Sequence, residues 1–394
     1  MDNGTILYIG GFELPDKNAA AHRVVNNGKI LKEFGYHVVF IDIDRSLEYT
    51  SKTTCDRKEI NGVEYWSRPY PKTYKQWSQY LFDIDFFIEV ICKYSDIKAV
   101  ICYNYQAIAL MKIKKYCNKN NIKILADCTE WYSTKGNNII FKLVKGFDSF
   151  LRMRVIHKQL DGLIVISHYL ENYYAKQGYI VRIPPLVDLS EDIWERETPQ
   201  SGVTKVRLVY AGNPGKNKDN LNCVIETLYQ LKDLSDYIFY IVGITKEEYL
   251  KDNPKQLYII NKLNANIEFK GKVSHTESLN YIKNADFSVL VRANTRVTKA
   301  GFPTKLVESI TCGTPVITTK TGDIEEYIAE DRTGAFIDMH DRRYSGIVLR
   351  KILLMNNDDR NRMKNFCLES NGFYYKNYID LTKVFLDKVF AENI

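Results

Sequence analysis

Short, continuous apolar runs alternate with helix-like segments along the first half of the chain. These runs are TILYIGG, YHVVFIDID, IKAVICYN, IKILADC and DGLIVIS. Because they are apolar without alternation, they are typical of parallel strands that are buried on both faces. Between them, apolar residues recur at helical spacing, most clearly over 20–34 and 106–118. We therefore predict a parallel α/β sheet covered by helices on both faces over residues 1–186.

The same alternation starts again after a polar, proline-containing connection, which we interpret as a linker over 187–202. The runs VRLVYAG, YIFYIVG, IEFKG, ADFSVLVRA and TPVITTK predict further strands, and the spacing predicts helices over 221–231, 274–284 and 304–311. A second doubly wound domain is therefore expected over 203–372. A C-terminal helix, within 373–394, is expected to pack back toward the first domain. In such domains ligands bind at the carboxyl ends of the strands, here expected to face a central cleft.

Length and composition agree with two soluble domains. The chain has 394 residues, of which 45% are hydrophobic and 26% charged. The net charge of +7 is a mild basic excess, which suits anionic small molecules or an anionic membrane surface and not a dedicated nucleic-acid binder. Eight scattered cysteines without a C-x-x-C pair predict reduced thiols and no zinc site. Neither a signal peptide nor an apolar stretch of about 20 residues is evident, so a cytoplasmic protein is expected.

The stretch KAGFPTKLVES, residues 299–309, combines a helix start with charged side chains. Pro303 fits the first turn of a helix, and Gly301 lets a ligand approach the backbone. The free N–H groups of that turn, with Lys299 and Lys305, predict an anion site. Glu308, one turn further on, can accept hydrogen bonds from a sugar diol. A plain helix start with a solvated Lys–Glu pair explains the stretch as well, and it is the commoner case for so short a motif.

The longer segment GFPTKLVESITCGTPVI resembles the Glu-x7-Glu region of retaining glycosyltransferases of family 4, which have the two-domain GT-B fold. In that family a Gly-Phe loop leads into a short helix, whose second-turn Glu binds the donor ribose. Glu308 matches this residue. The first Glu of the motif contacts the transferred sugar in the family, and it falls on Ala300 here. The resemblance thus implies a nucleotide site that lacks one sugar contact.

Other segments carry the same resemblance. YAGNPGKNKDNL resembles the turn that binds the donor diphosphate, with Lys218 at the family's Lys and Asn213 in place of its Arg. Arg292 is a candidate to replace the missing charge. IEFKGKVS resembles the strand and turn that hold the base, and GGFELPDKNAAAHRV resembles the Gly-rich loop facing the donor. The donor-binding residues implied are Gly11, Gly212, Asn213, Lys216, Lys218, Gly243, Lys272, Arg292, Gly301, Phe302, Pro303, Thr304, Lys305 and Glu308.

Two carboxylates are the catalytic candidates. The segment ILADCTEWYS places Asp127, Glu130 and Trp131 just beyond a predicted strand, where the family usually has a His. Carboxylates there could bind sugar or acceptor hydroxyls or take a proton, and the aromatic ring could pack on a sugar. A helix-capping Asp and a buried Trp form the alternative.

Two further features have open interpretations. The Asp-x-Asp strings at Asp42/Asp44 and Asp83/Asp85 are too short and common to predict a metal, and the family does not use one through such a motif. The basic, apolar segment IIFKLVKGFDSFLRMR, residues 139–154, could lie on an anionic membrane surface. A core-facing helix with a solvated basic side is the alternative.

These observations lead to one prediction of function and several alternatives. The prediction is a retaining, metal-independent hexosyltransferase that moves a sugar from a nucleotide-diphosphate donor, of UDP or GDP type, to a hydroxyl acceptor. The expected acceptor is a glycan or lipid-linked saccharide of a surface polysaccharide, and the expected location is cytoplasmic or peripheral at the inner face of the membrane. A non-catalytic GT-B protein that binds a nucleotide sugar or a partner transferase is the first alternative. A sugar-nucleotide epimerase is the second, and a dehydrogenase is the weakest, since no dinucleotide fingerprint follows the first strand.

Overall fold

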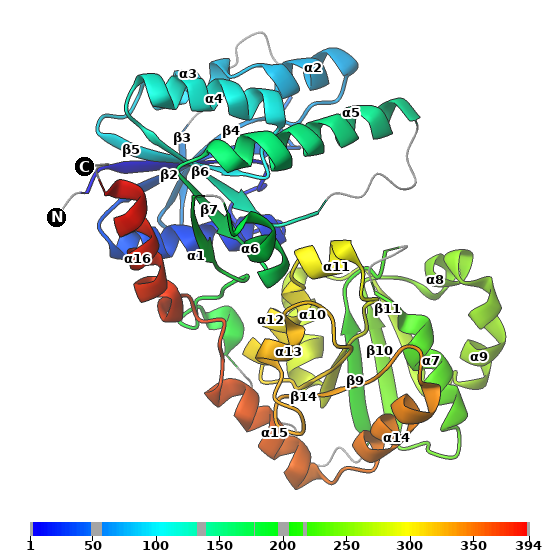
Figure 1. Cartoon of the computed structure of the whole chain (residues 1–394). Coiled ribbons are helices and arrows are strands. Elements are labelled where there is room, and N and C mark those ends of the chain that lie inside the picture. The colour runs from blue at the N-terminus through cyan, green and yellow to red at the C-terminus, as the bar shows by residue number, and fades with distance from the viewer. Residues whose placement is uncertain are drawn as a thin grey trace. The chain divides into compact units, whose positions relative to one another are not determined.

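The computed structural model describes residues 3–48, 57–131, 139–176, 178–195, 205–215 and 219–391, with the backbone alone at 139–141. The chain divides into two compact units. The first unit comprises Met1–Val187 together with Tyr374–Ile394, and the second comprises Asp188–Phe373. Each unit is a Rossmann-like α/β domain built on its own mostly parallel sheet, so the predicted fold class is confirmed (Figure 1).

The sheet of the first unit has the strand order β3-β4-β2-β1-β5-β6-β7-β8. Its strands are β1 (Thr5–Ile9), β2 (His37–Asp44), β3 (Arg57–Ile60), β4 (Val63–Pro69), β5 (Ile97–Tyr103), β6 (Lys123–Cys128), β7 (Gly162–Val165) and β8 (Tyr179–Arg182). All described pairs are parallel except β3 with β4. That hairpin turns at Asn61 and Gly62, both with positive φ, which is the Asn-Gly signal of a tight turn that our prediction had missed.

Helices cover this sheet and position its loops. They are α1 (Ala19–Glu33), α2 (Tyr74–Phe82), α3 (Asp85–Ile91), α4 (Ala107–Lys119), α5 (Ile139–Leu151), α6 (His168–Tyr174) and α16 (Ile379–Phe390). The first of them, α1, starts at Asn18, whose side chain accepts hydrogen bonds from two backbone N–H groups of the first turn. The last, α16, packs against β8 and α1. There Phe385 leaves no room for a side chain on Gly162, because an added Cβ would lie 2.8 Å from its ring.

The second unit has the strand order β11-β10-β9-β12-β13-β14, with all described pairs parallel. Its strands are β9 (Val206–Ala211), β10 (Tyr237–Val242), β11 (Ile267–Gly271), β12 (Phe287–Leu290), β13 (Val316–Thr318) and β14 (Gly334–Phe336). The chain order reverses between β9 and β12, which is where a doubly wound sheet opens a crevice at its carboxyl edge. The loops after these two strands are therefore the first place to look for a ligand site.

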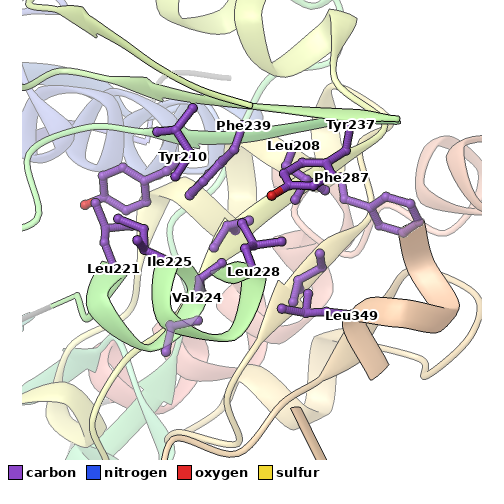
Figure 2. Packing of buried hydrophobic residues seen from close by; sticks show 14 of the residues in the cluster. Leu208, Tyr210, Leu221, Val224, Ile225, Leu228, Tyr237, Phe239, Phe287 and Leu349 are labelled. Carbon is purple, nitrogen blue, oxygen red and sulfur yellow. The ribbon is translucent and has the colours of Figure 1, made fainter. Parts of the chain in front are cut away.

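The helices of the second unit agree closely with the sequence pattern. They are α7 (Leu221–Gln230), α8 (Lys246–Asp252), α9 (Leu257–Lys262), α10 (His275–Asn284), α11 (Arg296–Ala300), α12 (Thr304–Thr311), α13 (Ile324–Tyr327), α14 (Arg342–Leu353) and α15 (Asn357–Glu369). The predicted bounds of α12 are confirmed, while α11 replaces part of a predicted loop because Thr295 caps it. Figure 2 shows the core between the sheet and α7, where strand residues such as Phe239 and Phe287 meet Val224 and Leu228. In the described part of the chain, no helix is long and apolar enough to cross a membrane.

Candidate nucleotide-sugar site

Three glycine-containing loops lie side by side at the carboxyl edge of β9, β10 and β11. The N–H of Gly212 donates to the carbonyl of Val242 over 2.8 Å, and the N–H of Gly243 donates to the carbonyl of Gly271 over 2.7 Å. Gly212 and Gly243 have φ of +125° and +105°, values that favour glycine. A Cβ on Gly243 would lie 2.7 Å from the Gly212 carbonyl group. Two of the predicted donor residues are thus brought together by backbone packing that tolerates no side chain.

Gly212, Gly243 and Gly271 form what we call the glycine layer, and the side chain of Lys305 lies against it at Gly212. A Cβ on Gly212 would lie 2.5 Å from Lys305 Cε, so the glycine leaves the space that the lysine occupies. The ammonium group of Lys305 donates to the Tyr210 hydroxyl and to the carboxylate of Asp219. It also lies 4.2 Å from the centre of the Tyr210 ring. The predicted cation is therefore present at the crevice, and it is held there by a residue that the sequence analysis had not singled out.

Arg292 meets the same carboxylate from the other side. Its Nε lies 3.3 Å from Asp219 Oδ1, and both side chains are almost buried, at 8% and 6% exposed. Burial lowers the pKa of Arg292 and of Lys305, and the negative charge of Asp219 opposes both shifts. The cluster of Lys305, Arg292 and Asp219 carries two positive charges and one negative charge. It keeps a net positive charge at the edge of the sheet, with its cations fixed in position by one carboxylate.

The start of α12 adds backbone donors beside this cluster. Pro303 lies just before the first helical residue, Thr304, and not within the first turn where we expected it; no described side chain caps the helix at this position. The first-turn N–H groups and the helix dipole therefore favour an anion, with Lys305 in the same turn. Phe302 packs edge-on against Tyr327 and Phe373, with ring centroids 5.3 and 5.8 Å away. These contacts favour a packing role for Phe302 over direct contact with a donor.

Glu308 lies on the next turn of α12 and is 23% exposed. Its Oε1 is 3.2 Å from Nε2 of His275, the first residue of α10. The imidazole can fix one carboxylate oxygen and leave the other for a hydroxyl ligand. His275 was missed in the sequence because nothing local distinguishes a histidine that follows the helix cap Ser274.

The remaining predicted donor residues are less informative. Lys216 and Lys218 lie outside the described residues. Lys272 is exposed after β11, and the side chain of Asn213 accepts a hydrogen bond from the N–H of Gly215 over 2.8 Å. Gly301, at φ −96°, has a backbone conformation that any residue can adopt, and the close approach of a ligand to it stays a prediction. Thr304 is half-buried at the start of α12.

A cavity of about 410 Å³ lies at the ends of β12, β13 and β14. Arg292 is the predicted donor residue that reaches it. The cavity is otherwise lined by Asn294, Thr319, Lys320, Thr321, Phe336, Ile337, Asp338, Met339, His340 and Tyr344. Arg292 therefore contacts Asp219 and also lines this cavity.

In the first unit, Asp127 is the second-last residue of β6 and is 0% exposed. Both of its oxygens accept hydrogen bonds from Arg23, at 2.8 to 3.1 Å, and the Tyr8 hydroxyl donates to Oδ2 over 2.5 Å. Arg23 also donates to the carbonyl of Ile183 over 2.8 Å. This geometry favours a structural role for Asp127, linking α1 with three strands or loops, over the catalytic role expected from the sequence.

Glu130 and Trp131 follow directly on β6. Glu130 is exposed and remains the catalytic candidate of the first unit. Trp131 is half-buried and meets the rings of Tyr169 and Tyr173 edge-on, at 5.9 and 5.1 Å between centroids. The aromatic group is thus part of a small cluster with α6.

The loop after β1 is held by a carboxylate. Asp42 accepts hydrogen bonds from the backbone N–H groups of Phe12, Glu13 and Leu14, at 2.8 to 2.9 Å. Burial raises the pKa of Asp42 to about 6, against the effect of these hydrogen bonds. Gly11, at the start of the loop, is half-buried. Among the described residues, no three His, Cys, Asp or Glu side chains gather where they could hold a metal ion.

Comparison with known proteins agrees with this geometry. The two parallel-sheet domains define a GT-B fold, the architecture of many glycosyltransferases. Residues 195–366, which include the glycine layer and α12, match the family described as glycosyl transferases group 1. This match supports a glycosyltransferase. No curated protein matches the chain.

Solved structures resemble the whole chain at low identity. Sucrose-phosphate synthase from Thermosynechococcus elongatus has a TM-score of 0.72 at 15% identity, with 98% of this chain and 99% of that one covered. A glycosyltransferase from Rickettsia africae has a TM-score of 0.68 at 14% identity, with 99% of both chains covered. Anabaena HepE, in complex with UDP and glucose, has a TM-score of 0.62 at 12% identity, with 98% and 99% covered. These likenesses establish the fold.

Proposed function

We propose that the chain is a glycosyltransferase that takes a sugar from a nucleotide-diphosphate donor, bound at the carboxyl edge of β9–β12. The observation that carries this proposal is the convergence of Lys305 and Arg292 on Asp219 beside the uncapped start of α12, with Glu308 one turn further on. The positive cluster suits a diphosphate, and a partly exposed carboxylate suits the hydroxyls of a ribose. The UDP complex of HepE, a protein of the same fold, supports a donor of this class.

The chemistry we propose is electrostatic. The bond between the anomeric carbon and the diphosphate oxygen breaks, and the electron pair stays on the diphosphate. Lys305, Arg292 and the α12 N–H groups stabilise the added charge, and Lys218 is proposed to help them. The acceptor oxygen forms the new bond and releases its proton to a base, for which Glu130 is our candidate. The protein cations supply the positive charge, so the mechanism is proposed to be metal-independent.

The finer aspects rest on the resemblance to family 4. That resemblance implies that the anomeric configuration is retained. It also implies that the acceptor is a glycan or a lipid-linked saccharide of a surface polysaccharide. Such an acceptor would be reached at the inner face of the membrane. The proposal places the nucleotide over the glycine layer and not in the 410 Å³ cavity, because Glu308 and the start of α12 do not line that cavity.

A nucleotide panel tests the proposal. UDP, GDP, ADP and the corresponding monophosphates are added to the protein, and the melting temperature is measured; a site that binds one diphosphate selectively raises it. Glu308→Gln should weaken the binding of that nucleotide roughly tenfold, as expected for the loss of a charge-assisted hydrogen bond. Glu277→Gln, an exposed residue on α10, is the matched control and should bind normally. If no nucleotide stabilises the wild-type protein, the proposed site is wrong.

A non-catalytic nucleotide-sugar binder is the second candidate, and Ala300 favours it. This residue stands where the family has its sugar-binding Glu, and it is 0% exposed. The donor sugar would then lack a contact that turnover requires. Slow release of free nucleoside diphosphate from the donor sugar, abolished in Glu308→Ala, supports the enzyme. Selective nucleotide binding without release, in the presence of any acceptor, supports the binder.

A further inference from the structure

The helix α5 presents its apolar side chains to solvent. Leu143, Phe147 and Phe150 follow one another at helical spacing and are 68%, 63% and 52% exposed, and Val144 beside them is 52% exposed. Four large apolar residues on one helix face form a contiguous patch, which in soluble proteins marks an interaction site. Scattered single residues of this kind would need no explanation.

Two polar side chains of the same segment, those of Asp148 and Arg152, face the protein instead. Asp148 Oδ1 accepts a hydrogen bond from the N–H of Ala107 over 2.7 Å, at the start of α4. Arg152 is buried, and its Nη1 donates to the carbonyls of Asn104 and Tyr105 over 2.9 and 3.1 Å. The fold therefore anchors this helix by hydrogen bonds on its polar side. The alternative of a core-facing apolar helix with a solvated basic side, considered from the sequence, is wrong.

The charges near the apolar patch are positive. Arg154 is exposed just after α5, and its guanidinium lies 5.2 Å from the centre of the Phe150 ring. Lys142 is half-buried on α5, where a long side chain can extend its ammonium group toward an interface. The acidic residue of the segment, Asp148, is turned toward α4. An apolar surface bordered by cations and without an outward acid is complementary to an anionic lipid surface.

The length of α5 also bears on how it could meet a membrane. The 13 residues of α5 are too few to span a bilayer, which needs about 20, and they suit a helix lying in the interface.

We propose that the face of α5 formed by Leu143, Val144, Phe147 and Phe150, with Arg154 at its end, binds the interfacial region of a membrane that contains anionic lipid. This α5 face attaches the protein peripherally. The inference does not depend on the transferase proposal, because it concerns a surface of the first unit only.

Vesicle sedimentation tests the α5 face. The wild-type protein should sediment with vesicles of phosphatidylcholine and phosphatidylglycerol, bind those of phosphatidylcholine alone much less, and detach partly at high salt. The double variant Leu143→Ser/Phe147→Ser should bind the anionic vesicles at least roughly tenfold more weakly. Arg154→Glu should show a smaller loss that depends on salt. The matched control Ile347→Ser/Leu354→Ser changes two residues of the second unit that are 63% and 64% exposed, and it should bind as wild type does.

Three outcomes of these experiments contradict the proposal. Absence of wild-type binding to anionic vesicles overturns it, as does binding that the double variant does not change. If the protein is instead a dimer that dissociates in the double variant, the α5 face joins two copies. Unchanged melting temperature and nucleotide binding in the double variant show that it is folded and keep this test separate from that of the transferase.

Discussion

Lys305 and Asp219 form an ion pair over the glycine layer although they lie 86 positions apart in the sequence. Asp219 holds Lys305 and Arg292 in position and reduces the repulsion between these two neighbouring cations. In the proposed site, this arrangement prepares the two cations for a diphosphate.

Replacement of Asp219 tests this role. Asp219→Asn should lower the free energy of unfolding by about 3 kcal/mol, because it leaves two cations close together in a nearly buried position. Pyrophosphate should restore part of the loss, since it supplies the missing negative charge. The measurement is urea unfolding with and without pyrophosphate. Asp233→Asn, which breaks an exposed pair with Arg350, is the control and should change neither quantity; an equal response of both variants contradicts the prediction.

The glycine layer gives a second prediction. Gly212→Ala places a Cβ where Lys305 Cε now lies and strains a backbone at φ +125°. Nucleotide binding should weaken roughly tenfold as the ammonium group is displaced. Gly215→Ala separates the two effects, because Gly215 also has positive φ but its added Cβ would meet no atom of the described residues within 4 Å. The expected result in calorimetric titration is normal binding by Gly215→Ala and weak binding by Gly212→Ala.

Substitutions of Asp127 and Glu130 should have different effects, the first on stability and the second on activity. Asp127→Asn leaves the buried charge of Arg23 without its partner and should cost about 4 kcal/mol of unfolding free energy. Glu130→Gln, at an exposed position, should leave stability within about 0.5 kcal/mol of wild type and lower turnover. Denaturant unfolding and a donor-release assay measure the two quantities. A stable but inactive Asp127→Asn would reinstate the catalytic role predicted from the sequence.

The burial of His157 leads us to predict that the free energy of unfolding falls in acid. Burial, with the nearby charge of Arg152, lowers the pKa of His157 to about 3, and its Nδ1 lies 2.9 Å from the Tyr174 hydroxyl. The unfolded chain binds a proton at this residue near pH 6.5, so its contribution to stability is complete above that pH and is lost as the pH falls toward 3. The loss should reach up to about 1.4 kcal/mol per pH unit. His157→Gln should be less stable at pH 7 and show a shallower decline in acid; parallel curves for both proteins would refute this.

The sequence predicted what depends on local pattern. Continuous apolar runs predicted ten of the fourteen described strands but missed β3, β4, β8 and β14, and the predicted bounds of α12 are confirmed. The partners of charged residues were not predictable in this way. Asp219 meets Lys305 across 86 positions of the sequence, and Asp127 meets Arg23 across 104.

The orientation of α5 was beyond the sequence for a related reason. Helical spacing shows that the segment has an apolar side and a polar side, but not which of them faces the protein. Asp148 accepts a hydrogen bond from the N–H of Ala107, and Arg152 donates to two carbonyls that precede α4. These bonds decide the orientation, and they depend on tertiary structure. The Asn61–Gly62 turn, in contrast, was a readable local signal.

Ala300 allows a direct test of the missing motif residue. If the site had merely lost a sugar contact, Ala300→Glu would restore it and raise donor affinity or turnover. The structure predicts the opposite, because Ala300 is 0% exposed at the end of α11 and a carboxylate there must be buried or must displace the helix. We expect a loss of about 3 kcal/mol of unfolding free energy and no gain in turnover. Ala293→Glu, at a half-buried position after β12, serves as the control and should destabilise less. A stable Ala300→Glu with faster donor release would show that the family's sugar contact can be rebuilt on this chain.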